Sequence, residues 1–196
     1  MKPTEIILCL HNKEEAFPSN KNYEIVEGLI PVYYNIDEEE YIYNDKLYKS
    51  ITYLIYYKEN YAIGLFGIFK KNKSLGYHYK DIERIKILYD PENNKEAYVY
   101  FSAHNSEGKW IKWEDCNTVF GSLLVYVAKY SHANYHKPGI KLRIFGFAND
   151  LCSNNDKTII KHPSLIRDNT IKYNPDKVSK YSSFIKRFFL PFYLNK

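Results

Sequence analysis

Short apolar runs bounded by turn-forming residues recur along this chain, and this pattern limits its fold more than any other feature. Most runs span five to eight residues and many alternate with polar residues, which is the period of a half-buried strand. Clear examples are residues 50–57, 82–89 and 97–102. The 21 Tyr and 11 Phe also favour strands, because aromatic rings fit a pleated surface. The pattern predicts an all-β fold: an antiparallel β-sandwich with long loops and one or two short helices at most.

The length of 196 residues predicts a single domain with a substantial core. Residues 90–95 contain Pro and Asn and predict a hairpin turn. Residues 149–176 are polar and predict a long loop packed on the sandwich. The aromatic and basic end, residues 181–196, fits either a membrane-surface anchor or a closing strand or short helix docked on the core.

Charge and cysteine usage restrict the partners and the compartment. The net charge of +5 comes from dispersed lysines, so we expect no nucleic-acid partner. Cys9, Cys116 and Cys152 form no CxxC pair, which favours a reducing compartment. The first apolar run has only five residues, and no stretch approaches twenty. We therefore expect no signal peptide or transmembrane segment, and a cytoplasmic protein that could also lie peripherally at membranes.

Two carboxylates stand out near the start of a predicted strand. The two-residue period places Asp81 and Glu83 on the same face as the apolar Ile85. Burying both groups is costly unless a cation, an arginine or backbone donors meet them. His78 precedes them by three residues and could reach the same site. A ligand or metal is one interpretation, and a structural ion pair, for example with Arg84, is the other.

Further polar residues follow other predicted strands. His104 and the pair Ser131 and His132 each lie where a strand ends, and loops at one end of a sandwich often form a site. A serine nucleophile at Ser131 is disfavoured, because the sequence around it lacks the Gly-x-Ser-x-Gly elbow. The acidic residues 37–40 are most simply a solvated loop or hairpin tip, with a binding role as the alternative.

Taken together and in order, these motifs resemble the vacuolar protein sorting-associated protein 62 family. The motifs are His78-x-x-Asp81-x-Glu83-Arg84, Tyr100-Phe101-Ser102-Ala103-His104, Trp110-x-x-Trp113, Ser131-His132-Ala133-Asn134-Tyr135 after a strand, Pro138-Gly139, and Gly146-Phe147-Ala148-Asn149-Asp150. The family usually has Trp where this chain has Ile82 and Gly where it has Tyr130. The resemblance implies one sandwich domain over residues 1–196, with its core at about 30–163 and a C-terminal extension over 164–196.

The chain is more distantly similar to the necrosis- and ethylene-inducing peptide-like cytolysins. These carry a Gly-His-x-His-Asp-Trp-Glu heptad, hold a divalent cation with its first His, its Asp and its Glu, and bind sphingolipid head groups. The resemblance places the metal ligands at His78, Asp81 and Glu83. The residue types do not distinguish Mg, Ca, Mn and Zn.

The leading functional hypothesis is a non-catalytic, cation-assisted module that recognises a phosphorylated or glycosylated lipid or glycan head group at a membrane surface. Such a module could serve in vacuolar or membrane trafficking, or as a toxin-like lectin. Its expected ligand-binding residues are His104, Ser131, His132, Asn149 and Asp150. The alternative is a metal-dependent hydrolase with His104 or His132 as acid or base. A pore-forming protein is a third hypothesis. The sequence predicts neither the oligomeric state nor a pathway.

Overall fold

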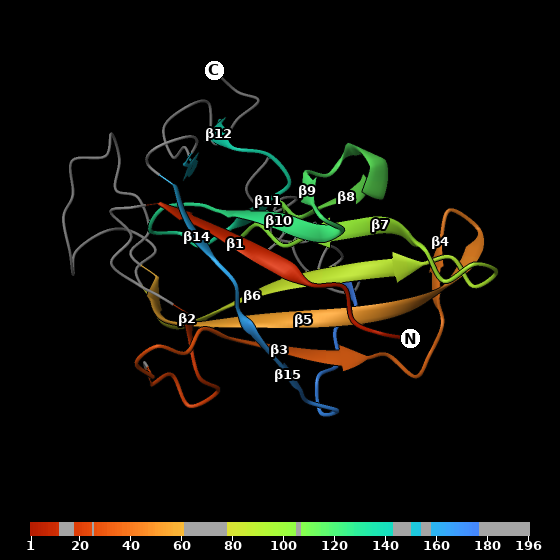
Figure 1. Cartoon of the computed structure of the whole chain (residues 1–196), viewed down its shortest axis with the longest axis horizontal. Coiled ribbons are helices and arrows are strands. Elements are labelled where there is room, and N and C mark those ends of the chain that lie inside the picture. Colours follow the sequence, from red (N-terminus) through yellow and green to blue (C-terminus); the bar gives the residue numbers. More distant parts are fainter. Residues whose placement is uncertain are drawn as a thin grey trace, which may run out of the picture.

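Strands dominate the computed structural model of the chain, which describes residues 1–11, 18–24, 26–60, 78–104, 107–142, 150–153 and 158–176. His78 is described by its backbone alone. The strands form facing sheets (Figure 1), and helix is limited in the described residues to the single 3-10 turn η2 (Trp113–Asp115) and a two-residue turn at 175–176. The predicted all-β sandwich is therefore confirmed.

The larger sheet is built around two long strands that pair antiparallel with each other, β5 (Lys46–Asn60) and β6 (His78–Tyr89). Its order is β15 (Ser164–Arg167), β3 (Pro31–Ile36), β5, β6, β7 (Glu96–Phe101) and β8 (Lys109–Lys112), and the short β2 (Pro18–Ser19) and β4 (Tyr41–Tyr43) also pair with β5. The predicted strands at 50–57, 82–89 and 97–102 correspond to β5, β6 and β7.

The smaller sheet faces the large one. Its order is β11 (Asn134–Tyr135), β10 (Ser122–Val127), β1 (Ile6–His11) and β14 (Thr158–Lys161), with β9 (Thr118–Val119) paired to β10. A separate two-stranded ribbon joins β12 (Gly139–Lys141) to β13 (Asp150–Cys152). An isolated bridge between Ala128 and Cys152 ties this ribbon to the end of β10.

Two strand pairings depart from the antiparallel sandwich that the sequence predicts. β1 pairs parallel with β10, and β15 pairs parallel with β3. The polar segment 149–176 is also not simply a loop, because it contains β13, β14 and β15. Since β1 and β15 belong to the sheets, the strands extend beyond residues 30–163 at both ends.

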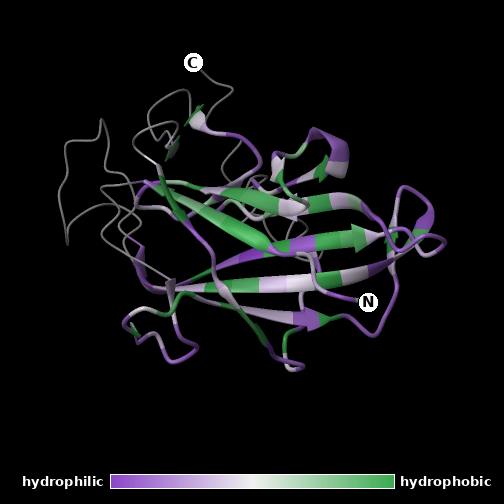
Figure 2. Ribbon diagram, viewed as in Figure 1, coloured by the Kyte–Doolittle hydropathy of each residue, from purple (hydrophilic) through white to green (hydrophobic). Residues whose placement is uncertain are grey.

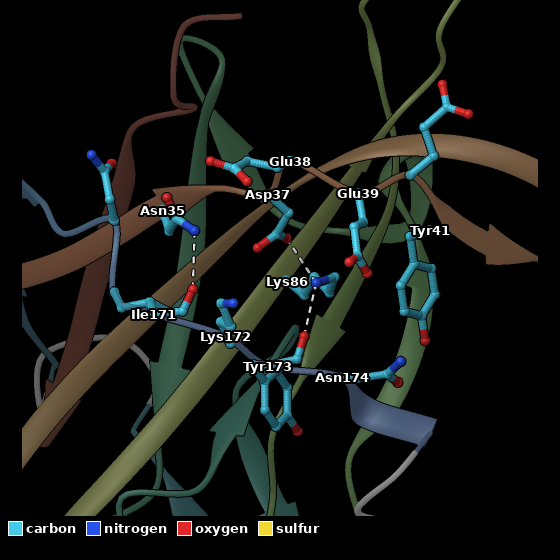
Figure 3. Close-up of a pocket in the computed structure, with 12 residues that line it drawn as sticks. Asn35, Asp37, Glu38, Glu39, Tyr41, Lys86, Ile171, Lys172, Tyr173 and Asn174 are labelled. Atoms are coloured by element: carbon cyan, nitrogen blue, oxygen red, sulfur yellow. Dashed lines mark hydrogen bonds and ion pairs between the residues drawn. The ribbon is translucent and has the colours of Figure 1, made fainter.

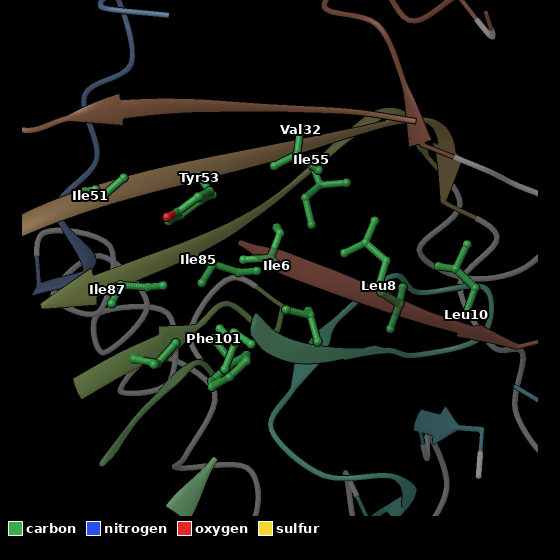
Figure 4. Close-up of a cluster of buried hydrophobic side chains, with 14 of the residues drawn as sticks. Ile6, Leu8, Leu10, Val32, Ile51, Tyr53, Ile55, Ile85, Ile87 and Phe101 are labelled. Atoms are coloured by element: carbon green, nitrogen blue, oxygen red, sulfur yellow. The ribbon is translucent and has the colours of Figure 1, made fainter. Parts of the chain in front are cut away.

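The core lies between the two sheets. Apolar residues are frequent along β1, β5, β6 and β10, and much of the connecting chain is hydrophilic (Figure 2). Leu8 of β1 and Ile55 and Ile85 of the large sheet are fully buried in one cluster (Figure 4). Burying each such side chain stabilises the fold by about 1.5–3 kcal/mol. Alternation along β6 continues this apolar face directly into the buried Glu83 and Asp81.

Two predictions concern contact with a membrane, one for the C-terminal segment and one for the absence of a transmembrane segment. Residues 181–196 lie outside the described residues, so both interpretations of that segment stay predictions. Among the described residues, no helix has the length and apolar character needed to cross a membrane.

Candidate functional site

A buried polar network lies at one end of the sandwich, where β6 begins, β7 ends and β10 passes into β11. The antiparallel pairing of β6 with β7 brings the start of one strand beside the end of the other. The network contains Asn60, Asp81, Glu83, Ser102, His104, Ser131, His132, Tyr135 and Asp150. These side chains come from both sheets and from the β12–β13 ribbon, so the site depends on the assembled fold.

Asp81 links the large sheet to the β10–β11 connection. Its Oδ2 atom lies 3.0 Å from Nδ1 of His132 and accepts a hydrogen bond of 2.9 Å from Nδ2 of Asn60. The His132 ring stacks on Tyr57, with ring centroids 3.9 Å apart and planes within 4°. His132 is fully buried, and Asp81 is 7% exposed. This arrangement fixes both the position and the orientation of the imidazole.

Glu83 lies two residues further along the same face of β6 and is 6% exposed. Its Oε2 atom accepts a hydrogen bond from the Ser102 hydroxyl. Burial, followed by the nearby charge of Asp81, raises the pKa of the Glu83 carboxyl well above its usual range. The fold therefore favours the neutral form of Glu83, unless a positive group compensates the charge.

Asp150 is the third carboxylate of the network and comes from β13. It accepts hydrogen bonds of 2.7 Å from the Ser131 hydroxyl and 2.6 Å from the Tyr135 hydroxyl, and its Oδ2 atom lies 2.7 Å from Nε2 of His104. Burial raises the pKa of Asp150, but His104 and the two hydroxyl donors outweigh it, and the pKa is lowered. Asp150 is therefore held as an anion.

The backbone around the network adopts unusual conformations. Lys80, His104, Tyr130 and His132 all have positive φ angles, between 46° and 70°. Such angles cost non-glycine residues of the order of 1 kcal/mol or more, and they cluster at functional sites. Glycine adopts such angles without strain, whereas Tyr130 does so at a φ of 70°. The local chain is thus strained in the segments that carry the site residues.

The predicted site residues are partly brought together. Asp81, His132, Ser131, Asp150 and His104 join one connected set of contacts, and Glu83 lies beside it within electrostatic range of Asp81 and Asp150. Asn149 and the side chain of His78 lie outside the described residues. Of the predicted residues that the structure describes, His104 has the most exposed side chain, at 24%, so a ligand would meet it first. Their functional roles remain predictions.

The metal prediction meets a mixed donor set. Asp81 and Glu83 offer the carboxylate oxygens that divalent cations prefer. In the part of the chain that the structure describes, no three His, Cys, Asp or Glu side chains converge closely enough to hold an ion. The His78 side chain would have to supply the third ligand, so cation binding at His78, Asp81 and Glu83 stays a prediction.

Sequence reasoning missed several members of the network and the Tyr57 ring that stacks on His132. Asn60 ends β5, and Tyr57 lies in its apolar run, so neither carries a local signal. Ser102 and Tyr135 fall inside motifs that the resemblance singled out, and only three-dimensional contacts show their role. The hydroxyl of Ser131 donates to Asp150, which leaves it with a carboxylate partner rather than an imidazole base.

A hollow of about 570 Å³ adjoins the network between β8, β11 and β12. Tyr135 belongs to both its wall and the network. Asn134 also lines it, is buried, and has a side-chain amide without a hydrogen-bond partner among the described residues. Phe101 and Ile111 make part of the wall apolar, while Lys109 adds a positive charge. The hollow can therefore take a ligand with both polar and apolar surfaces.

A second hollow of about 570 Å³ lies beside the acidic residues 37–40 (Figure 3). Asp37 forms a 2.7 Å ion pair with the buried Lys86 and accepts hydrogen bonds from Ser50 and Thr52. Lys86 also donates to the Tyr173 carbonyl. The prediction of a solvated stretch is thus wrong for Asp37, whose partner Lys86 links it to the C-terminal described segment.

Comparison with known proteins adds little to this geometry. No family model matches the sequence, and no curated protein matches it. Among solved structures, NLPPya in complex with mannosamine matches with a TM-score of 0.47 and 14% sequence identity, over 89% of this chain and 74% of that chain. This is a distant likeness to a necrosis- and ethylene-inducing peptide-like protein, and it carries no argument about function. The resemblance to the vacuolar family stays a prediction.

Proposed function

We propose that the chain is a non-catalytic binding module. It recognises a phosphorylated or glycosylated head group at a membrane surface. A divalent cation held by His78, Asp81 and Glu83 assists the binding of this head group. The head group enters past His104 and occupies the hollow that shares Tyr135 with the network.

The proposal depends above all on one observation: three buried carboxylates gather at one end of the sandwich. Asp81 and Asp150 each have an imidazole within hydrogen-bonding distance, whereas the Glu83 carboxyl accepts a hydrogen bond from the neutral Ser102 hydroxyl. Bringing carboxylates together away from water is costly unless the charge is compensated. A cation at Asp81 and Glu83 would replace the proton that burial favours on Glu83 and would leave coordination positions for ligand oxygens.

The amide of Asn134, which has no hydrogen-bond partner among the described residues, supports a polar ligand in the neighbouring hollow. A buried amide without a partner costs about 1–3 kcal/mol. Hydroxyl groups of a sugar or an inositol can donate to its oxygen and accept from its nitrogen. The adjacent Phe101 and Ile111 suit the apolar face of a sugar ring.

Binding rather than turnover fits the positions of the candidate catalytic groups. His132 is sealed between Tyr57 and Asp81, and the Ser131 hydroxyl is committed to Asp150. Neither group can act on a substrate without rearrangement. The alternative, a metal-dependent hydrolase, is favoured by one contact. His104 is partly exposed and lies 2.7 Å from Asp150, an arrangement that orients a general base.

Calorimetric titration with soluble head groups tests the proposal. The probes are myo-inositol phosphate and methyl glycosides, each with Ca²⁺ or Mn²⁺ and again with chelator. We expect binding that requires the cation, that Asp81→Asn and Glu83→Gln abolish, and that the remote control Asp90→Asn retains. Binding equal in all three variants would refute the site. Chelator-sensitive release of phosphate or sugar, lost in His104→Asn, would favour the hydrolase instead.

A further inference from the structure

The β12–β13 ribbon has two chemically different faces. Ile140 of β12 lies directly opposite Leu151 of β13, so their side chains share one face. Leu142 follows two residues after Ile140 and is 78% exposed, while Ile140 is 65% exposed and Leu151 is also exposed. The other face turns Asp150 and Cys152 inward, where both are buried. In Figure 1, β12 lies outside the two facing sheets. Ile140 and Leu142 are exposed, and both also line the hollow beside the network.

Positive charge surrounds this ribbon. His136, just before β12, is close enough to Lys109, Lys137 and Lys141 for their charges to lower its pKa, together with burial, and Asp115 acts against them. Lys109 and Lys137 are exposed. Besides Asp115, the neighbouring hollow contributes one acidic residue among the described residues that line it, Glu107. The balance is net positive beside an exposed aliphatic strip.

We propose that the outer face of the β12–β13 ribbon, formed by Ile140, Leu142 and Leu151 with the lysines beside it, is the surface that docks on an anionic bilayer. Three aliphatic side chains are too few for a stable dimer interface, which buries about 1,200–2,000 Å². They suffice for shallow insertion at a lipid interface, where nearby lysines meet anionic head groups. Charge complementarity therefore favours lipid over a second copy of the chain.

The two faces of the ribbon connect docking to recognition. Asp150 on the inner face belongs to the polar network, and it lies opposite Lys141 in the ribbon. A ribbon lying on the bilayer therefore brings the network to the level of the head groups. In this respect the inference rests on the proposed function and names the surface through which that function reaches the membrane.

Vesicle cosedimentation tests the aliphatic contribution. The probe is phosphatidylcholine vesicles containing phosphatidylserine, compared with phosphatidylcholine alone. We expect the chain to bind the anionic vesicles, and each of Ile140→Ser and Leu142→Ser to lower the partition coefficient about tenfold. Ile42→Ser is the matched control, because Ile42 is 66% exposed on β4 at a distant part of the sandwich (Figure 1). All three positions are exposed, so circular dichroism should show unchanged folds.

The charge contribution has its own pair of variants. Lys109→Gln and Lys137→Gln should each lower anionic-vesicle binding about fivefold, and added salt should have the same effect. Lys49→Gln, an exposed lysine on β5 near β4, should not. Equal binding by the ribbon variants and their controls would overturn the proposal. So would a dimer in light scattering that Ile140→Ser dissociates, because the face would then be a self-contact.

Failure of the docking surface can be separated from failure of the head-group site. Asp81→Asn leaves the outer face of the ribbon unchanged, so it should still bind phosphatidylserine vesicles while losing soluble head groups. Leu151→Ser, on the same face of the ribbon but outside the lining of the hollow, should show the reverse pattern. Loss of both activities in both variants would contradict the division between the two faces.

Discussion

Glu83→Gln converts a buried carboxyl into an amide of nearly the same shape. The Ser102 hydroxyl that donates to Glu83 can donate equally to the amide oxygen, so the packing is retained. The substitution removes the titratable carboxyl of Glu83. Burial, and then Asp81, raise the pKa of Glu83 well above its usual range, and glutamine carries no such proton.

The sign of the effect follows from proton linkage. Between the unfolded pKa of Glu83, about 4.5, and its higher folded pKa, the folded protein binds more protons than the unfolded chain. The contribution of the Glu83 proton to the free energy of unfolding is fully present below about pH 4.5 and is lost as the pH rises through the folded pKa. The slope reaches about 1.4 kcal/mol per pH unit for one proton. Relative to wild type, Glu83→Gln should therefore gain stability as the pH rises from 4.5.

Urea unfolding across pH 4–8 measures this difference. We expect the two proteins to diverge with pH in the presence of chelator, with the glutamine variant more stable at neutral pH. Saturating Ca²⁺ should then stabilise wild type and not the variant, since a bound cation replaces the Glu83 proton. Parallel stability curves with chelator would refute the assignment of Glu83 as a buried, neutral carboxyl. Equal Ca²⁺ effects on both proteins would refute its role as a ligand.

Three further substitutions test the fold. Phe120→Asn should raise the free energy of unfolding by about 1 kcal/mol, because Phe120 is fully exposed with a φ of 48° in a turn that favours Asn. A thermal scan should therefore show a higher melting temperature, and an unchanged melting temperature would contradict this prediction. Lys86→Met should destabilise by about 3–5 kcal/mol, since it leaves Asp37 without its ion-pair partner, and Asp37→Asn in the same chain should restore part of that loss in denaturant titration. Leu8→Ala should cost about 2–5 kcal/mol of unfolding free energy, and a loss under 1 kcal/mol would place Leu8 outside the core.

Alternation along single strands was sufficient to predict the centre of the large sheet. The runs at 50–57 and 82–89 fall within β5 and β6, and the same period correctly turns Asp81 and Glu83 toward the buried face. Local pattern succeeds there because one face of each strand is buried along its length.

Pairing between distant segments could not be predicted in this way. β14 and β15 are four residues long, only partly buried and preceded by polar residues, so they resemble loop; what makes them strands is pairing with β1 and β3. The Lys86–Asp37 pair joins residues 49 apart, and Asn60 reaches Asp81 across 21 residues. No periodic signal encodes such contacts, and the parallel pairings were missed for the same reason.

An X-ray structure of the protein grown with saturating Mn²⁺ tests the central claim most directly, because anomalous scattering locates the ion without ambiguity. The account predicts an anomalous peak bounded by His78, Asp81 and Glu83, with the Glu83 proton displaced. A map with no peak there, and with Asp81 still held by His132 and Asn60, would contradict a cation-assisted site.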